Sequence, residues 1–204
     1  MKYVSIDIET TGLDTENYQV LSIGAVIEDT NNVLPIGDLP VFHGAIMHRA
    51  VTGDLYALNL NKDLIETIVH YQTAQDQDEK NDLVQMTGMQ FYEKDDIVKA
   101  FYDFLIKNGF EPDGEKLHIT VAGKNFATFD LKFLERLPRW KQYIKVRQRI
   151  MDPTVLFTDW ANDESLPNLY TCKERSGQFD DNTVTHDAVD DAMDVIKLFR
   201  TQYY

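Results

Sequence analysis

The stretch Tyr3-Val4-Ser5-Ile6-Asp7-Ile8-Glu9 alternates in a way that is typical of a β-strand. Side chains of a strand point to opposite faces in turn, so Val4, Ile6 and Ile8 share one face while Asp7 and Glu9 share the other. Two carboxylates held this close repel and raise each other's pKa unless a cation lies between them. The pair therefore indicates either a divalent cation site or an ordinary solvated strand face.

The rest of the chain predicts a mixed sheet flanked by helices. Strands are expected at 3–9, 20–27, 41–47 and 117–121, the first two forming a hairpin. Helices are expected at 63–71, 95–107, 126–137, 153–160, 167–175 and 188–201. The polar stretch 73–82 is expected to be an exposed loop. Hairpin strands followed by strand-helix units predict an α/β fold.

A third acid lies within an apolar helix stripe. The helix expected at 126–137 has apolar residues at Phe126, Phe133, Leu134 and Leu137, and Asp130 falls in the middle of this stripe. Burial of an unpaired carboxylate is costly, so this group must be paired, neutral or bound to a metal. A salt bridge to a nearby cation such as Arg149 is the alternative to a metal.

The last expected helix carries a fourth acid. At about 100° per residue, Asp191 projects at the rim of an apolar face, whereas Asp187, Asp190 and Asp194 project further round and are expected to be solvated. His186 must lie at or before the start of this helix, because a continuous helix would turn it away from Asp191. From there its imidazole could take a proton from water, although a surface histidine is the simpler interpretation of His186 alone.

Three pieces of the sequence together resemble the exonuclease motifs of the DEDDh (DnaQ-like) family. These pieces are Asp7-Ile8-Glu9-Thr10-Thr11-Gly12-Leu13, then 125–130, then His186 with four residues before Asp191-Ala192. The family includes proofreading subunits of DNA polymerases, small-RNA trimming enzymes and oligoribonucleases. A looser likeness to oligoribonucleases lies at 133–138 and 149–152, but Thr10 stands where those enzymes tend to have methionine.

The resemblance implies a ribonuclease-H-like fold and stepwise release of nucleoside 5'-monophosphates from a 3' end. It implies two divalent cations, Mg²⁺ or Mn²⁺, and His186 as general base. The implied metal ligands are Asp7, Glu9, Asp130 and Asp191. Two such ions can stabilise both the attacking and the leaving oxygen of a phosphodiester.

The same resemblance implies where the substrate lies. The backbone at Thr10 and Gly12 would receive the terminal nucleotide, Leu13 would pack against its base, and Asn125 would lie nearby. The alternatives are that Gly12 serves a turn and that Leu13 belongs to the core.

The length, composition and charge of the chain limit the classes of protein to which it can belong. A length of 204 residues, 43% of them hydrophobic, predicts one domain over 1–204. The single cysteine, Cys172, excludes an internal disulfide framework and suits a reducing cytoplasm. No apolar segment approaches the ~20 residues that cross a bilayer, so no membrane association is expected. The formal charge of −14 is unusual for a nucleic-acid enzyme unless bound cations offset the acids locally.

One segment, 132–149, is basic. It carries seven Lys and Arg residues against the single acid Glu135, with Trp140 and Tyr143 between them. It could follow phosphates while an aromatic ring stacks on a base, or it could be a solvated helix face. The expected partners are 3' ends of single-stranded DNA or RNA, with short strands favoured. A homodimer, a polymerase-associated role and a non-catalytic regulatory protein with the same fold are further alternatives, although the presence of all four acids and His186 argues against the last.

Overall fold

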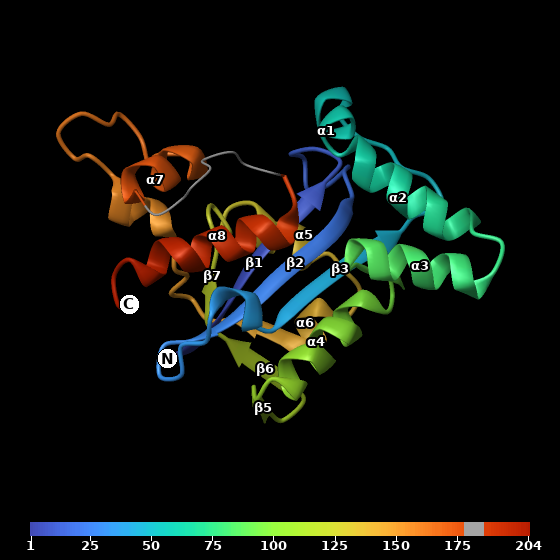
Figure 1. The fold of residues 1–204 in the computed structure, drawn as a ribbon, viewed down its shortest axis with the longest axis horizontal. Helices are drawn as coiled ribbons and strands as arrows, with labels where there is room; N and C mark the ends of the chain where they lie inside the picture. The colour runs from blue at the N-terminus through green and yellow to red at the C-terminus, as the bar shows by residue number, and fades with distance from the viewer. Residues whose placement is uncertain (178–185) are drawn as a thin grey trace.

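The computed structural model describes residues 1–177 and 186–204. Within these ranges the central sheet has the strand order β4-β3-β2-β1-β7, with β1 paired antiparallel to β2 and parallel to β7 (Figure 1). β2 and β3 are antiparallel, and β3 and β4 are parallel. The strands are β1 (Lys2–Thr10), β2 (Val20–Asp29), β3 (Val41–Met47), β4 (Gln90–Glu93) and β7 (Val121–Ala122). The predicted mixed α/β sheet is confirmed.

Helices cover both faces of this sheet. Tyr3 of β1 packs with Val195 and Ile196 of α8 (Ala188–Arg200), the red helix that crosses β1 and β2 in Figure 1. The alternate residues of β1, such as Ile6, face the larger core, which includes Phe101 of α4 (Ile97–Lys107). Side-chain alternation along β1 therefore places Asp7 and Glu9 on the same side of the sheet as α8.

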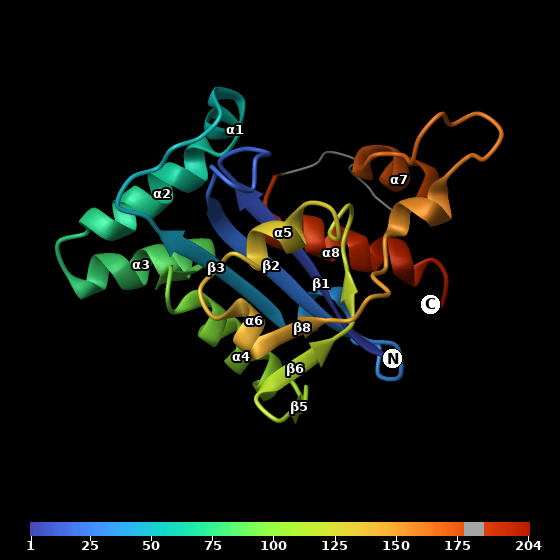
Figure 2. The ribbon, with the colours of Figure 1, turned by 180° about the vertical axis from the view of Figure 1, so that it is seen from behind.

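The remaining elements surround this frame (Figure 2). Three helices link β3 to β4: α1 (Leu55–Leu60), α2 (Lys62–Thr73) and α3 (Gln77–Thr87). A small sheet with the order β5-β6-β8 comprises β5 (Pro112–Asp113), β6 (Lys116–Ile119) and β8 (Ile144–Val146). The others are η1 (Ile36–Asp38), α5 (Asp130–Leu134), α6 (Trp140–Tyr143), η2 (Pro153–Phe157) and α7 (Leu169–Ser176). Across the described residues, none of the helices is both long and apolar enough to span a membrane.

The prediction of an exposed loop at 73–82 is wrong, because α3 begins within these residues. Asp76 caps this helix by accepting a hydrogen bond from the Glu79 amide at 3.0 Å, and Gly88 ends it with a φ of 67°. Leu83 is the one buried residue of α3, so the helix lacks the apolar period on which the prediction relied. The residues that cap its two ends, Asp76 and Gly88, were the signal for a helix that the sequence contained.

The bounds of three other elements also differ from the prediction. The strand expected at 117–121 divides into β6 of the small sheet and β7 of the central sheet. The helix expected at 126–137 shrinks to α5, although the four apolar residues of its predicted stripe are all buried. The helix expected at 153–160 is the shorter η2. Turns replace the missing helical residues while tertiary packing still buries the same side chains.

Asp194 is not the solvated acid that helical spacing predicted. It is 6% exposed, and its carboxylate contacts the Lys173 ammonium at 2.6 Å and the Lys197 ammonium at 2.8 Å. Lys173 comes from α7, which the sequence pattern could not place against α8. This buried cluster fastens α7 to α8, and Cys172 is buried beside it.

Candidate active site

Three acids meet where β1 ends and α8 begins. Asp7 and Glu9 come from β1, Asp191 comes from the first turn of α8, and one carboxylate oxygen of each lies within 4.8 Å of the others. Asp130 lies outside this distance but is close enough for its charge to raise the pKa of Asp7. The structure thus brings the four predicted acids into one locality, with Asp130 at its edge.

Gly24 of β2 allows α8 to come this close. A Cβ atom on Gly24 would lie 2.2 Å from the Ala188 carbonyl carbon, so any side chain there would push the start of α8 away. In the sheet register Gly24 lies directly opposite Asp7. A glycine inside a strand pattern often marks a close approach of another backbone, and this signal was available in the sequence.

A fixed turn presents Asp130. Asn125 has a φ of 55°, and its carbonyl accepts hydrogen bonds from the Thr128 and Phe129 amides at 3.0 Å each. The Asn125 amide donates to Oδ2 of Asp152 at 2.9 Å. Asp152 therefore holds the turn that precedes Asp130, a positioning role that the sequence patterns did not reveal.

The four carboxyl groups carry raised pKa values. Burial raises the pKa of Glu9 to about 8, with the Asp191 charge as the next cause, and burial raises the pKa of Asp130 to about 7. Burial, followed by the Asp194 charge, raises the pKa of Asp191 to about 7. The pKa of Asp7 lies well above its usual range because of burial and then the charges of Asp130, Asp191 and Glu9. Without a cation, these groups resist carrying four negative charges together.

These acids are suited to divalent cations. Oδ1 of Asp130 and Oδ1 of Asp191 are buried and have no hydrogen-bond partner among the residues that the structure describes. The alternative salt bridge from Asp130 to Arg149 is absent from the same part of the chain. Lys124 is the cation whose charge acts on both Asp7 and Asp130. Buried oxygens that lack a partner in an acidic cluster match the oxygen ligands that Mg²⁺ and Mn²⁺ take.

His186 lies ahead of α8, as its spacing from Asp191 requires. It is exposed, has a φ of 53°, and lines a cavity of about 480 Å³ together with Asp7, Asp130 and Asp191. The next residue, Asp187, caps α8 by accepting hydrogen bonds from the Val189 and Asp190 amides. The cap fixes the point at which the chain leaves the helix and so fixes where His186 can reach.

Four residues predicted to contact substrate border the same site. Oγ1 of Thr10 donates to the Gly12 carbonyl at 2.9 Å, and a Cβ on Gly12 would lie 2.3 Å from the Tyr18 ring. Leu13 is 82% exposed, so it is not the core residue of the alternative interpretation. Asn125 is exposed in the cavity that holds Asp7 and His186.

An apolar pocket opens beside Glu9. It has a volume of about 460 Å³, and Leu13 and Phe129 line it together with Tyr18, Tyr56 and Leu60. Tyr56 and Leu60 belong to α1, which was absent from the sequence prediction. The Asn61 side chain, which follows α1, donates to the Thr10 carbonyl at 3.1 Å and so joins α1 to the end of β1. A short helix with little periodicity leaves no clear sequence signal.

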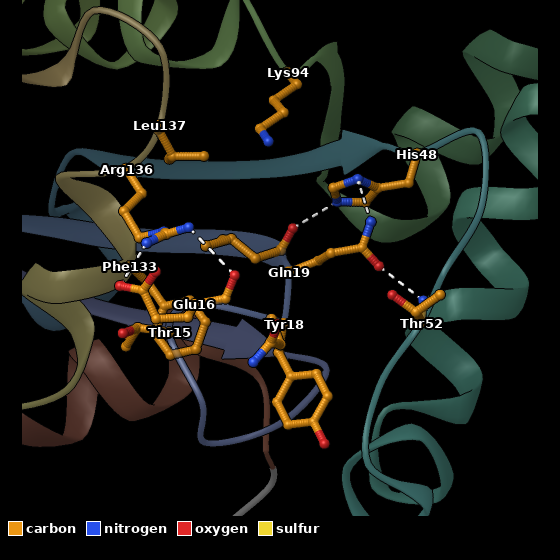
Figure 3. A pocket seen from close by; sticks show the side chains of 12 residues that line it. Thr15, Glu16, Tyr18, Gln19, His48, Thr52, Lys94, Phe133, Arg136 and Leu137 are labelled. Carbon is orange, nitrogen blue, oxygen red and sulfur yellow. Dashed lines mark hydrogen bonds and ion pairs between the residues drawn. The ribbon is translucent and has the colours of Figure 1, made fainter.

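Another hollow lies on the other side of Tyr18 (Figure 3). There the Arg136 guanidinium contacts the Glu16 carboxylate at 2.8 Å and the Glu16 carbonyl at 3.2 Å. Nε2 of His48 donates to the Val20 carbonyl at 2.7 Å, and Gln19 bridges His48 to the Thr52 amide. These contacts connect the 14–19 loop to the segment after α5 and to the chain after β3. They therefore stabilise the positions of Gly12 and Leu13, which directly precede this loop.

The expected stacking residues of 132–149 are only partly available. Trp140 is buried and stacks on Phe101 with ring centroids 5.9 Å apart, so it cannot meet a base. Tyr143 is half-buried against Tyr102. The apolar spacing around Trp140 serves the core rather than a nucleic-acid surface.

A mixed sheet with acids at the end of its first strand and at the start of a C-terminal helix gives the chain a ribonuclease-H-like fold. The model of the family "3'-5' exoribonuclease Rv2179c-like domain" matches residues 2–203, and the chain belongs to this family. The predictions of a DnaQ-like 3'-5' exonuclease and of a metal-dependent hydrolase are confirmed at the level of the family.

Solved structures share the fold at low identity. Escherichia coli exonuclease I in complex with a dT13 oligonucleotide is 16% identical with a TM-score of 0.56, and the match covers 98% of this chain and 40% of that one. Exonuclease I from Methylocaldum szegediense is 15% identical with a TM-score of 0.57 and the same coverages. The Neurospora crassa Pan2 catalytic unit is 13% identical with a TM-score of 0.56, covering 98% of this chain and 27% of that one. The chain thus spans less than half of these neighbours, and no curated protein matches it.

Proposed function

We propose that the protein removes nucleotides one at a time from the 3' end of single-stranded RNA and releases nucleoside 5'-monophosphates. The observation that carries the proposal is the cluster of buried and half-buried acids at the junction of β1, α5 and α8, in which two carboxylate oxygens are buried without a hydrogen-bond partner among the described residues. The family description supports RNA as the substrate, and the exonuclease I neighbours support a single strand.

The proposed ligands of two divalent cations are Asp7, Glu9, Asp130 and Asp191. When bound, Mg²⁺ or Mn²⁺ would supply positive charge to the attacking and the leaving oxygen of the scissile phosphodiester. Burial makes each of these acids a stronger attractor for cations than a solvated carboxylate would be, because the surrounding medium screens their charge weakly.

His186 acts in this proposal as the general base. Its exposure lets the imidazole reach a water molecule at the acids without first leaving a packed environment. The imidazole takes the proton of the attacking water, which is the part that histidine plays in general base catalysis. Asp187 keeps the base at the helix start by capping α8.

The apolar pocket beside Glu9 receives the terminal nucleotide. Leu13 and Phe129 contact the base from the end of β1 and from the turn before Asp130, and Tyr56 of α1 adds an aromatic face. Stacking on such side chains accepts every base, which fits an enzyme that trims strands regardless of sequence. Asn125 and Lys124 line the adjoining cavity, where the scissile phosphate would lie.

A degradation assay tests the proposal. Single-stranded RNA and DNA of one sequence, labelled at the 5' end, are incubated with the protein and Mg²⁺, Mn²⁺ or EDTA. We expect a ladder that shortens from the 3' end, mononucleotide products, faster loss of RNA, and no reaction in EDTA. Internal fragments would point instead to an endonuclease, and intact RNA in every condition would favour a non-catalytic protein of the same fold.

We further propose that 1–204 act as one exonuclease domain and that the protein works in the cytoplasm. Its single buried thiol, Cys172, supports the second proposal because reducing compartments do not select for disulfides.

A further inference from the structure

Two of the seven cations of the basic segment 132–149 are paired with acids. Arg136 forms an ion pair with Glu16 at 2.8 Å, and Lys141 forms one with Glu135 at 2.9 Å. Lys145, Arg147 and Arg149 are exposed, and within 1–177 and 186–204 none of the three has an ion-pair partner. They stand at alternate positions of the sequence, which concentrates positive charge in a chain with a net charge of −14.

Lys145 lies on an edge strand, and Arg147 and Arg149 lie in the segment that directly follows it. β8 lies at the edge of the small sheet, where Lys145 and Arg147 alternate with buried Ile144 and half-buried Val146. Alternation puts Lys145 and Arg147 on one face, about 6.7 Å apart along the strand. This separation is close to that between successive phosphates of an extended single strand of nucleic acid.

A bulge then carries Arg149 outward. The Arg147 amide donates to the Ile119 carbonyl and the Met151 amide donates to the Val121 carbonyl, both at 2.9 Å. Between these two hydrogen bonds lie three residues on one side, 148–150, and one residue on the other, Thr120. The longer side, 148–150, must therefore protrude. Arg149, in the middle of this protruding segment, is exposed.

Together these side chains border one hollow of about 590 Å³. Lys145, Arg147 and Arg149 share its wall with His118 and Thr120, and its lining among the described residues contains no acid. His118 lies beside Lys145 in the register of β6 and β8. The hollow is therefore a concave, positively charged surface on an otherwise acidic protein, and its charge suits a polyanion.

Two hydrogen bonds connect the border of the hollow to the candidate active site. Met151, at its border, accepts a hydrogen bond from the Gly123 amide, and the next residue, Asp152, holds the Asn125 amide. Asn125 and Lys124 line the cavity of the acids. From Thr120 in the hollow to Lys124 in that cavity is four residues, which in extended backbone is about 13 Å. A strand whose 3' end lies at the acids can therefore reach the hollow within a few nucleotides.

We propose that the hollow at Lys145, Arg147 and Arg149 binds the phosphodiester backbone of the RNA substrate upstream of its 3' end. The inference rests on the proposed exonuclease function and adds to it a dependence on substrate length. Strands long enough to reach the hollow gain affinity by displacing counterions, whereas a dinucleotide gains nothing there. Contact with phosphates carries no base preference, in keeping with the trimming of varied sequences.

The test compares two triple variants with equal changes of charge. In the first, Lys145→Gln, Arg147→Gln and Arg149→Gln are combined. In the control, Lys99→Gln, Lys107→Gln and Lys141→Gln remove the same charge from exposed positions outside the hollow. Binding of a fluorescent 12-nucleotide RNA is measured by anisotropy at several salt concentrations, in a background of Asp7→Asn that suppresses turnover. With Asp7 restored, kcat/KM is compared between the 12-mer and a dinucleotide.

We expect the hollow variant to bind the 12-mer at least tenfold more weakly than the control, with its ratio of 12-mer to dinucleotide kcat/KM lowered to a similar extent. Loss of three phosphate contacts should flatten the slope of log affinity against log salt by about 2. Equal affinities and slopes in the two variants would overturn the proposal. If the wild type hydrolyses neither RNA, the proposed exonuclease function fails, while the anisotropy series still decides whether the hollow binds RNA.

Discussion

Adjacent residues of α8 differ sharply in their surroundings. Asp191 lies with Asp7 and Glu9, and its Oδ1 is buried without a partner among the described residues, whereas Asp190 is exposed. Helical rotation of about 100° separates the two side chains. At this site the direction in which each acidic side chain points therefore matters more than the number of acids.

We expect Asp191→Asn to lower Mg²⁺-dependent RNA hydrolysis by about 100-fold or more, because the amide is a poorer metal ligand than the carboxylate. Asp190→Asn is the matched control and should stay within about twofold of the wild type. Steady-state assays at saturating Mg²⁺ compare them. Equal losses in both variants would remove Asp191 from the proposed ligand set.

The raised pKa values also predict how stability varies with pH. The pKa of Glu9 is about 8 and those of Asp130 and Asp191 are about 7, all above the unfolded values of about 4. Protons bind the folded state more tightly, so these groups contribute stability that is complete below pH ~4 and is lost as the pH rises through 7 to 8. The Tm of the metal-free protein should fall by several degrees between pH 5.5 and 8.5.

Mg²⁺ should reverse this loss, because it binds the ionised acids of the folded state. Scanning calorimetry at pH 5.5 and 8.5, with Mg²⁺ and with EDTA, checks both expectations. The rise in Tm caused by Mg²⁺ should be larger at pH 8.5. An equal rise at both values would show that these acids do not hold the ion.

At the scale of elements, the site depends on how closely α8 approaches β2. Gly24 permits this contact, and the approach carries both Asp191 and His186 toward Asp7. A clash at this contact must move the helix or the strand, since the Ala188 backbone cannot rotate away as a side chain could. Helix position therefore matters here as much as ligand identity.

Gly24→Ala should lower activity by at least about tenfold while the protein still folds, because displacement by about 1 Å is enough to disturb a catalytic site. Gly37→Ala is the control, since a Cβ there meets no atom within 4 Å. Activity and circular dichroism are measured for both variants. Full activity in Gly24→Ala would mean that the contact can relax without moving the acids.

At the scale of the whole molecule, a buried ion pair joins distant parts of the chain. The Arg200 side chain contacts the Glu28 carboxylate at 2.6 Å and also donates to the Leu34 carbonyl at 2.8 Å. Glu28 is fully buried on β2, while Arg200 ends α8. The pair fixes the far end of the helix whose first turn carries Asp191.

Arg200→Ala should reduce the free energy of unfolding by about 3–5 kcal/mol, because it leaves the Glu28 charge buried and unpaired. Urea denaturation measures this loss. Adding Glu28→Gln to Arg200→Ala should recover part of it, since the amide needs no counter-charge. A loss under about 1 kcal/mol in the single variant would show that water replaces the arginine.

Much of the site was predictable because it rests on local periodicity. Alternation put Asp7 and Glu9 on one face of β1, helical rotation separated Asp191 from Asp190, and spacing placed His186 ahead of α8. Apolar neighbours in sequence correctly indicated that Asp130 is buried, even though most of its predicted helix is turn. These features need only the geometry of neighbouring residues.

The sequence by itself thus determined the α/β class, the family motifs and the acids of the candidate site. Tertiary structure alone decided that Asp194 is buried against Lys173, that Trp140 belongs to the core, and that α1 borders the apolar pocket beside Glu9. It also gathered Lys145, Arg147 and Arg149 into a hollow whose lining, over the described residues, contains no acid. The physical reason is that periodicity reports which way a side chain points, whereas its partners come from segments whose distance in space no local pattern encodes.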